Sequence, residues 1–181
     1  MMVTNYDNFR QTCQPQIFSF SKTIMKYVLL NPESPETYLK TIKSCKLLFL
    51  KNPILIIPIL RYTKFDGWKY CCTNEMETFY NGLQNIDLDK IQSKIWITEI
   101  LRVFPDSSKT IASKIVPKIY RCDAKMLQLE NQNISFQDFQ FLSAFVDNEI
   151  NFHEVTVEKE DGNVVLIDEL CQNLSDVVIF I

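Results

Sequence analysis

Glycine is scarce in this sequence, which holds three glycines in 181 residues. This scarcity argues against the glycine-rich loops that hold nucleotide phosphates and against flexible linkers. A long apolar run is also missing, because Lys51, Asn52 and two prolines interrupt the most apolar region, residues 47–60. A membrane-spanning helix needs roughly 20 predominantly apolar residues. We therefore expect no membrane segment, and the first 20 residues lack the pattern of a secretory signal.

Clustered metal ligands are missing as well. The six cysteines include no CxxC pair, and the adjacent Cys71 and Cys72 have neither metal-ligand spacing nor an easy disulfide geometry. His153 is the single histidine of the chain. We therefore expect no metal site, no cofactor, and reduced thiols in a cytoplasmic or nuclear protein.

Catalytic patterns are equally sparse. No serine or cysteine motif accompanies His153, so a nucleophile and an orienting partner are lacking. The acidic segment Glu158–Gly162 does not have the ligand spacing of a calcium loop. We expect a protein that is not an enzyme. The remote alternative is an unrecognised hydrolase, which would need a concave pocket with converging carboxylates around His153.

Charge is unevenly distributed along an otherwise ordinary composition of 46% apolar and 23% charged residues. Residues 1–70 carry ten basic and four acidic side chains, whereas residues 122–181 carry two basic and twelve acidic ones. A basic head and an acidic tail suggest two surfaces with different partners, although solvation alone can produce such a split. The acidic end argues against a nucleic-acid partner.

Residues 15–53, termed the helical head, have the pattern of two amphipathic helices joined by a proline-marked turn. Ser34 is a suitable N-cap for the second helix, and Pro35 suits the first helical position because its missing N–H needs no partner there. Asn52 and Pro53 then end that helix.

The next segments are less regular. Residues 54–60 predict a short third helix that Pro58 bends or ends, with a buried strand as the less favoured alternative. Phe65–Trp68 is a turn signal, and residues 68–80 read as a hairpin or as an irregular connector.

The C-terminal half alternates between strand and helix patterns. Four strands are predicted, at residues 94–98, 124–129, 153–157 and 176–181, with one helix between each successive pair, at residues 110–120, 136–146 and 165–174. Strand–helix units that recur at about 20–30 residues are typical of a leucine-rich-repeat-like solenoid with parallel strands. A small compact α/β sheet is the alternative. The last strand reaches Ile181, so we expect either a longer architecture or a covered edge.

The helical head resembles the F-box, in which a proline-led helix, a short loop and a second helix bearing a Cys-Lys pair form a helical hairpin. The segments that carry the resemblance are Pro15–Phe18, Leu29–Pro35 and Ser44–Lys46. The combination with a repeat-bearing half is similar to the F-box-like families expanded in nematodes, in which phrases similar to Ile119–Asp123 and Lys94–Ile97 recur.

The resemblance implies a substrate-recruiting subunit of a cullin-RING ubiquitin ligase, which holds a target near a ubiquitin-charged enzyme and does no chemistry itself. The helical head would bind a Skp-type adaptor protein, and the C-terminal half would bind an unknown protein substrate. The residues implied in adaptor binding are Pro15, Ile17, Phe18, Leu30, Pro32, Cys45 and Lys46. Alternatively, the apolar members of this set pack against the chain's own core.

We therefore expect an α/β chain, α+β overall, with three parts. An F-box-like helical module spans residues 13–62, a connector or hairpin spans 63–92, and a leucine-rich-repeat-like arc with a parallel sheet spans 93–181. A second hypothesis is an α/β repeat scaffold that binds other proteins without adaptor docking, its helical head merely capping the repeats.

Overall fold

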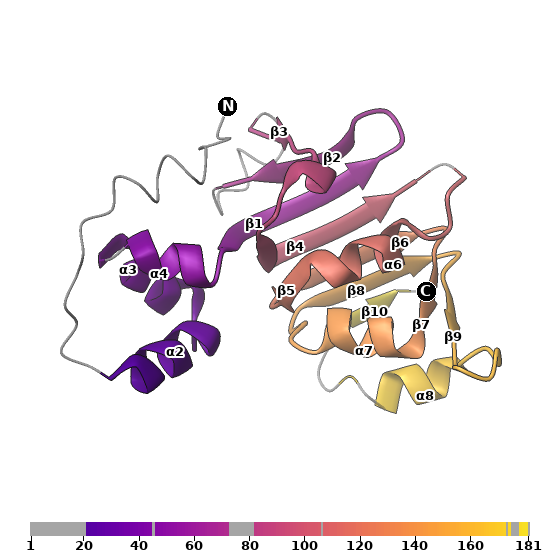
Figure 1. The fold of residues 1–181 in the computed structure, drawn as a ribbon. Coiled ribbons are helices and arrows are strands. Elements are labelled where there is room, and N and C mark those ends of the chain that lie inside the picture. The colour runs from indigo at the N-terminus through magenta and orange to yellow at the C-terminus, as the bar shows by residue number, and fades with distance from the viewer. Residues whose placement is uncertain are drawn as a thin grey trace. The chain divides into compact units, whose positions relative to one another are not determined.

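The computed structural model describes residues 21–44, 46–72, 82–105, 107–172, 174 and 178–180. The chain divides into two compact units, unit 1 at residues 1–54 and unit 2 at residues 55–181 (Figure 1). Within the described residues there are six α-helices and a mostly parallel sheet. This confirms the mixed α/β class that the sequence predicted.

Unit 1 is helical in its described part. Its helices are α2 (Lys22–Leu30), α3 (Pro35–Ser44) and α4 (Lys46–Lys51). The predicted start of α3 is confirmed, because the Ser34 hydroxyl accepts the Thr37 N–H at 3.2 Å and Pro35 is the first helical residue. Ser21 caps α2 in the same way, by accepting the Ile24 N–H at 3.3 Å.

Tyr38 of α3 fixes the end of unit 1. Its side chain is buried, and its hydroxyl donates to the Asn52 carbonyl at 2.7 Å and accepts the Ile54 N–H at 3.0 Å. A single hydroxyl therefore satisfies two main-chain groups at the point where the helices give way to the first strand.

Unit 2 contains an eight-stranded sheet. In space its strands follow the order β10-β8-β6-β4-β1-β2-β3, and β5 also pairs with β4. The strands are β1 (Ile54–Thr63), β2 (Gly67–Cys71), β3 (Gln84–Asn85), β4 (Lys94–Phe104), β5 (Ile119–Cys122), β6 (Met126–Glu130), β8 (Glu149–His153) and β10 (Val178–Phe180). A second, two-stranded sheet pairs β7 (Asn133–Ser135) with β9 (Thr156–Glu158).

The strands β4, β6, β8 and β10 are parallel and pair in the order in which they occur in the sequence. Each step to the next strand contains a helix: α6 (Ile111–Ile115), α7 (Phe136–Ser143) or α8 (Ile167–Gln172). The 3-10 helices are η1 (Leu88–Lys90) and η2 (Val116–Lys118). By contrast, β2 pairs antiparallel with both β1 and β3.

The core of unit 2 lies between the sheet and the helices α6 and α7, which cover one of its faces (Figure 1). Burial alternates along the strands as a half-buried sheet requires. In β6 the buried residues are Leu127 and Leu129, and in β8 they are Ile150 and Phe152. Phe139 of α7 packs edge-on against Phe152, with ring centroids 6.1 Å apart.

The prediction of a third helix over residues 54–60 is wrong, because this segment is the first part of β1. Three of its isoleucines are buried, at Ile54, Ile57 and Ile59. The ladder between β1 and β2 begins at Ile59, one residue after Pro58. Proline, which cannot donate to a ladder, therefore lies outside the part of β1 that pairs with β2.

Other boundaries also differ from the predictions. The predicted strand at 153–157 is displaced, since the sheet contains Glu149–His153 and the following strand β9 belongs to the smaller sheet. The predicted helix at 110–120 ends early, because Ile119 begins β5. Segments within the predicted connector, residues 63–92, form β2 and β3 of the main sheet. Residues 73–80 of the predicted hairpin or connector lie outside the described residues.

Candidate functional site

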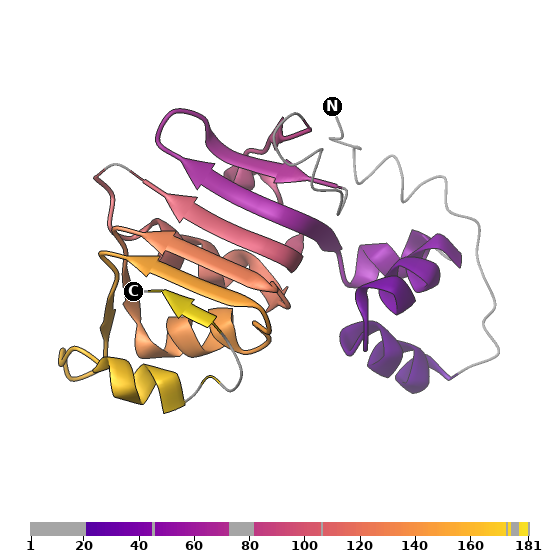
Figure 2. The ribbon, with the colours of Figure 1, turned by 180° about the vertical axis from the view of Figure 1, so that it is seen from behind.

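The face of the sheet opposite α6 and α7, termed the open face, carries no helix of unit 2 in the described part of the chain (Figure 2). Its side chains alternate with the buried ones along each strand. It comprises Ile59, Arg61, Thr63, Lys69, Ile100, Arg102, Met126, Gln128, Glu130, Glu149, Asn151, His153, Val178 and Phe180. The larger part of this surface is polar or charged, in contrast to the core face.

Parallel register places these side chains in rows across the strands. Arg102 lies opposite Gln128, which lies opposite Asn151, which in turn lies opposite Phe180. Glu149, in the neighbouring row, accepts a hydrogen bond of 2.9 Å from the Gln128 side chain, which joins the two rows. The Arg102 guanidinium approaches the Met126 sulfur at 3.6 Å. The open face is thus an ordered array of polar groups fixed on rigid strands.

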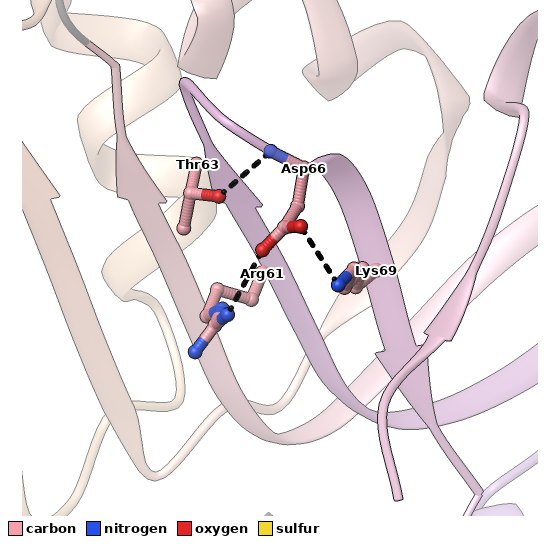
Figure 3. Close-up of polar contacts among 4 residues, drawn as sticks. All are labelled: Arg61, Thr63, Asp66 and Lys69. Carbon is pink, nitrogen blue, oxygen red and sulfur yellow. Dashed lines mark hydrogen bonds and ion pairs between the residues drawn. The ribbon is translucent and has the colours of Figure 1, made fainter. Parts of the chain in front are cut away.

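The hairpin between β1 and β2 carries a charge cluster (Figure 3). Asp66 forms ion pairs with Lys69 at 3.0 Å and with Arg61 at 3.7 Å, and its N–H donates to the Thr63 hydroxyl at 3.3 Å. The hydrogen bond from Lys69, followed by the charges of Lys69 and Arg61, holds the pKa of Asp66 below its usual value. Gly67 follows at φ +67°, a conformation that glycine adopts without strain, and the predicted turn is confirmed.

A cavity of about 360 Å³ opens at the edge of the sheet where the parallel strands end. Its lining includes Phe65, Glu130, Asn131 and Glu154. Asn131 and Glu154 both have positive φ, at 49° and 54°, and they follow β6 and β8 at equivalent positions. These strained residues are explained by the tight turn that ends each strand. His153 is exposed and is not part of this lining.

The described residues contain no cluster of metal ligands, and the thiol of Cys122 is buried. Among them, no group of three His, Cys, Asp or Glu side chains could hold a metal ion. Burial raises the pKa of the Cys122 thiol to about 12, so this cysteine is protonated at neutral pH and is a poor nucleophile.

The residues implied in adaptor binding are only partly within the described part of the chain. Pro15, Ile17, Phe18 and Cys45 lie outside it. Leu30, at the end of α2, is 47% exposed, and Lys46 at the start of α4 is also exposed. Pro32 is buried, which corrects the expectation that its ring is an exposed anchor.

Helix α2 exposes apolar side chains on one side. Ile24, Tyr27 and Val28 follow helical spacing and are 51%, 70% and 46% exposed. Their spacing was evident in the sequence, but spacing alone predicts a side packed against the core. An apolar helix face in contact with solvent is a feature of docking helices.

Sequence reasoning missed Arg61, Lys69 and Arg102 as members of one surface. The signal was the alternation of Ile59, Arg61 and Thr63, which was missed because residues 54–60 were assigned to a helix. The buried amide of Gln132 was also missed, and no periodicity reveals it.

Nothing matches this chain among models of known families, curated proteins or solved structures. In the part of the chain that the structure describes, no helix is long and apolar enough to cross a membrane. The apolar side of α2 and the open face of the sheet are therefore the features from which a function can be inferred.

Proposed function

We propose that the chain is a non-enzymatic recruiter of F-box-like type. Unit 1 docks a Skp-type adaptor of a cullin-RING ubiquitin ligase, and unit 2 holds a protein substrate on its open face. The observation that carries this proposal is the solvent-exposed apolar side of α2, formed by Ile24, Tyr27 and Val28. Such a side costs hydration free energy in the isolated chain, and a partner groove would remove it from water.

The proposal also includes a leucine-rich-repeat-like architecture for unit 2, and the strand register supports it. Equivalent positions of successive strands are aligned in register at Leu101, Leu127, Ile150 and Ile179. These residues follow one another at 26, 23 and 29 residues, within the range of about 20–29 residues for leucine-rich repeats. The segment Leu127–Ile134 also follows the repeat pattern L-x-L-x-x-N-x-L, with Gln132 at the position of the asparagine.

An extended repeat surface suits a recruiter because repeat proteins bind partners along continuous faces. The mechanism is proximity: a target held on the open face meets a ubiquitin-charged enzyme at raised effective concentration, with no bond made or broken by this chain. The second candidate is a scaffold that uses the open face without adaptor docking. It is favoured by the burial of Pro32, which removes one of the implied anchors.

The test is a pull-down of the full chain with a purified Skp-type adaptor. We expect capture by the wild type and loss of capture by the double variant Ile24→Asp/Tyr27→Asp, because charged side chains cannot enter an apolar groove. The variant Ile17→Asp/Phe18→Asp tests the residues implied by the resemblance.

The matched control is Phe65→Asp/Leu166→Asp, which places two carboxylates at apolar side chains of unit 2 that are 86% and 71% exposed. This control should bind the adaptor as the wild type does. Capture of no adaptor by the wild type, or equal capture by all variants, would rule out adaptor docking and leave the scaffold.

A further inference from the structure

Three cationic side chains lie on adjacent strands at one end of the open face. Lys69 of β2 lies opposite Arg61 of β1 in the antiparallel ladder, so both point to the same face. Strand β4, which carries Arg102, is the other neighbour of β1 in the sheet. The cations therefore occupy three adjacent strands.

The two arginines follow residues of β1 and β4 that belong to one apolar cluster. Ile100 packs against the small cluster formed by Ile59 and Cys71, which is separate from the main core. The arrows of β1 and β4 point in the same direction (Figure 2). Arg61 and Arg102 are each two residues beyond this contact, and alternation keeps them on the same face.

Neighbouring like charges on adjacent strands repel one another, and an anion placed above them relieves this cost. Asp66 is shared between Arg61 and Lys69, whose side chains remain 22% and 23% exposed. Guanidinium groups bind carboxylates in a two-bonded geometry that lysine cannot reproduce. This end of the open face is therefore built to take an acidic side chain.

The opposite end of the open face has a different character. Glu130 and Glu149 lie on β6 and β8, so acidic groups would repel an anion there. Beyond them Val178 and Phe180 of β10 are 55% and 53% exposed. From β1 to β10, the side chains of the open face therefore change from cationic, through polar and acidic, to apolar.

We propose that the open face binds an extended protein segment that carries acidic residues over β1 and β4 and a large apolar residue over β10. β10 lies three strand positions from β4 and four from β1. At about 4.8 Å per strand and about 3.3 Å per extended residue, this distance corresponds to roughly four to six residues between the acidic and apolar groups.

This inference names the substrate class of the proposed recruiter and rests on that function only for its biological role. The test is selection of a phage library of random dodecapeptides on the immobilised full chain. We expect enrichment of Asp or Glu at a spacing of roughly four to six residues from Leu, Ile, Phe or Trp, in either order. Binding of the selected peptides, followed by fluorescence anisotropy, should weaken as salt increases.

The double variant Arg61→Gln/Arg102→Gln should bind the selected peptides with an affinity at least about tenfold lower, because charge-assisted hydrogen bonds are lost. Lys109→Gln/Lys114→Gln removes two exposed cations elsewhere in unit 2 and is the matched control. Circular dichroism monitors the folding of each variant. If the glutamine variant does not fold, the double variant Arg61→Lys/Arg102→Lys replaces it. The lysines keep the positive charge but cannot form the two-bonded geometry, so peptide binding should still be weaker than in the wild type.

The proposal is overturned if selection enriches no acidic residues, or if the arginine and lysine-control variants bind the peptides equally. It is also overturned if sedimentation shows that the chain self-associates and that the arginine variant abolishes this, because the occupant is then a second copy. Adaptor pull-down with the same variants separates the two proposals. Peptide binding without adaptor capture would refute docking alone, and adaptor capture without acidic enrichment would refute this inference alone.

Discussion

The hydroxyl of Tyr38 shows how much a single atom contributes at the end of the helical unit. It bonds to the Asn52 carbonyl and the Ile54 N–H, two main-chain groups at the junction between the helices and the first strand. The tyrosine was visible in the sequence only as one apolar position of an amphipathic helix. Its ring fits that prediction, since it is buried, but its polar contacts depend on a strand start that the sequence assigned to helix.

Replacing Tyr38 by phenylalanine should lower the free energy of unfolding by about 1–3 kcal/mol, because the buried Ile54 N–H loses its acceptor. Urea denaturation followed by circular dichroism measures the change. Tyr27→Phe is the matched control, since this tyrosine is 70% exposed and its loss of a hydroxyl should have little effect. Equal stability of Tyr38→Phe and wild type would contradict the role assigned to the hydroxyl.

Local capping at the start of α3 was predictable residue by residue. Ser34 and Pro35 act through the main chain of their own helix, so their role needs no knowledge of the rest of the fold. The roles of Arg61 and Arg102 were not predictable in this way. They share a surface only because β1 and β4 are neighbours in the sheet, and this neighbourhood is a property of topology.

Among the elements, β1 and the turn after β6 were missed for different reasons. In β1 a sequence rule was misapplied, and after β6 no sequence pattern marks the contact. In β1 the proline rule was applied without knowing which residues pair with β2, and the ladder begins only after Pro58. After β6, the Gln132 side chain accepts the Ala112 N–H at 2.8 Å and donates to the Ser108 and Asn131 carbonyls at 2.9 and 2.7 Å. A buried amide therefore joins this turn to the first turn of α6.

Gln132→Leu should destabilise unit 2 by about 1–3 kcal/mol, because the buried main-chain groups lose their partners while the side chain keeps a similar size. Thermal unfolding would measure this loss. Gln137→Leu is the comparison, since Gln137 is exposed on α7 and its replacement should leave the melting temperature nearly unchanged. A melting temperature unaffected by Gln132→Leu would show that water satisfies the same groups.

On the scale of the whole molecule, the position of the division between the units decides which part of the chain can fold alone. The predicted arc began at residue 93, but unit 2 begins at Leu55 and includes β1, β2 and β3. Ile57 and Leu60 of β1 belong to the main core. The repeat-like parallel strands were predicted because each has its own apolar pattern, whereas the contribution of the earlier strands depends on long-range pairing.

A fragment of residues 53–181 should fold cooperatively, whereas a fragment of residues 93–181 should not, because the shorter one exposes the edge of β4 and loses core residues of β1. Amide-proton dispersion in nuclear magnetic resonance spectra and urea denaturation of both fragments would test this. Cooperative folding of the shorter fragment would show that the folding unit begins near residue 93, as the sequence predicted.

The sequential pairing of β4, β6, β8 and β10 has a consequence for how such a protein diverges. Each strand–helix unit contacts mainly its nearest neighbours, so a unit can be duplicated or deleted in a gene without redesign of distant units. Every duplication would widen the sheet by about 4.8 Å and move the apolar end of the open face farther from its arginines. Under the proposed function, a chain with more units would bind segments in which the acidic and the apolar residues lie farther apart.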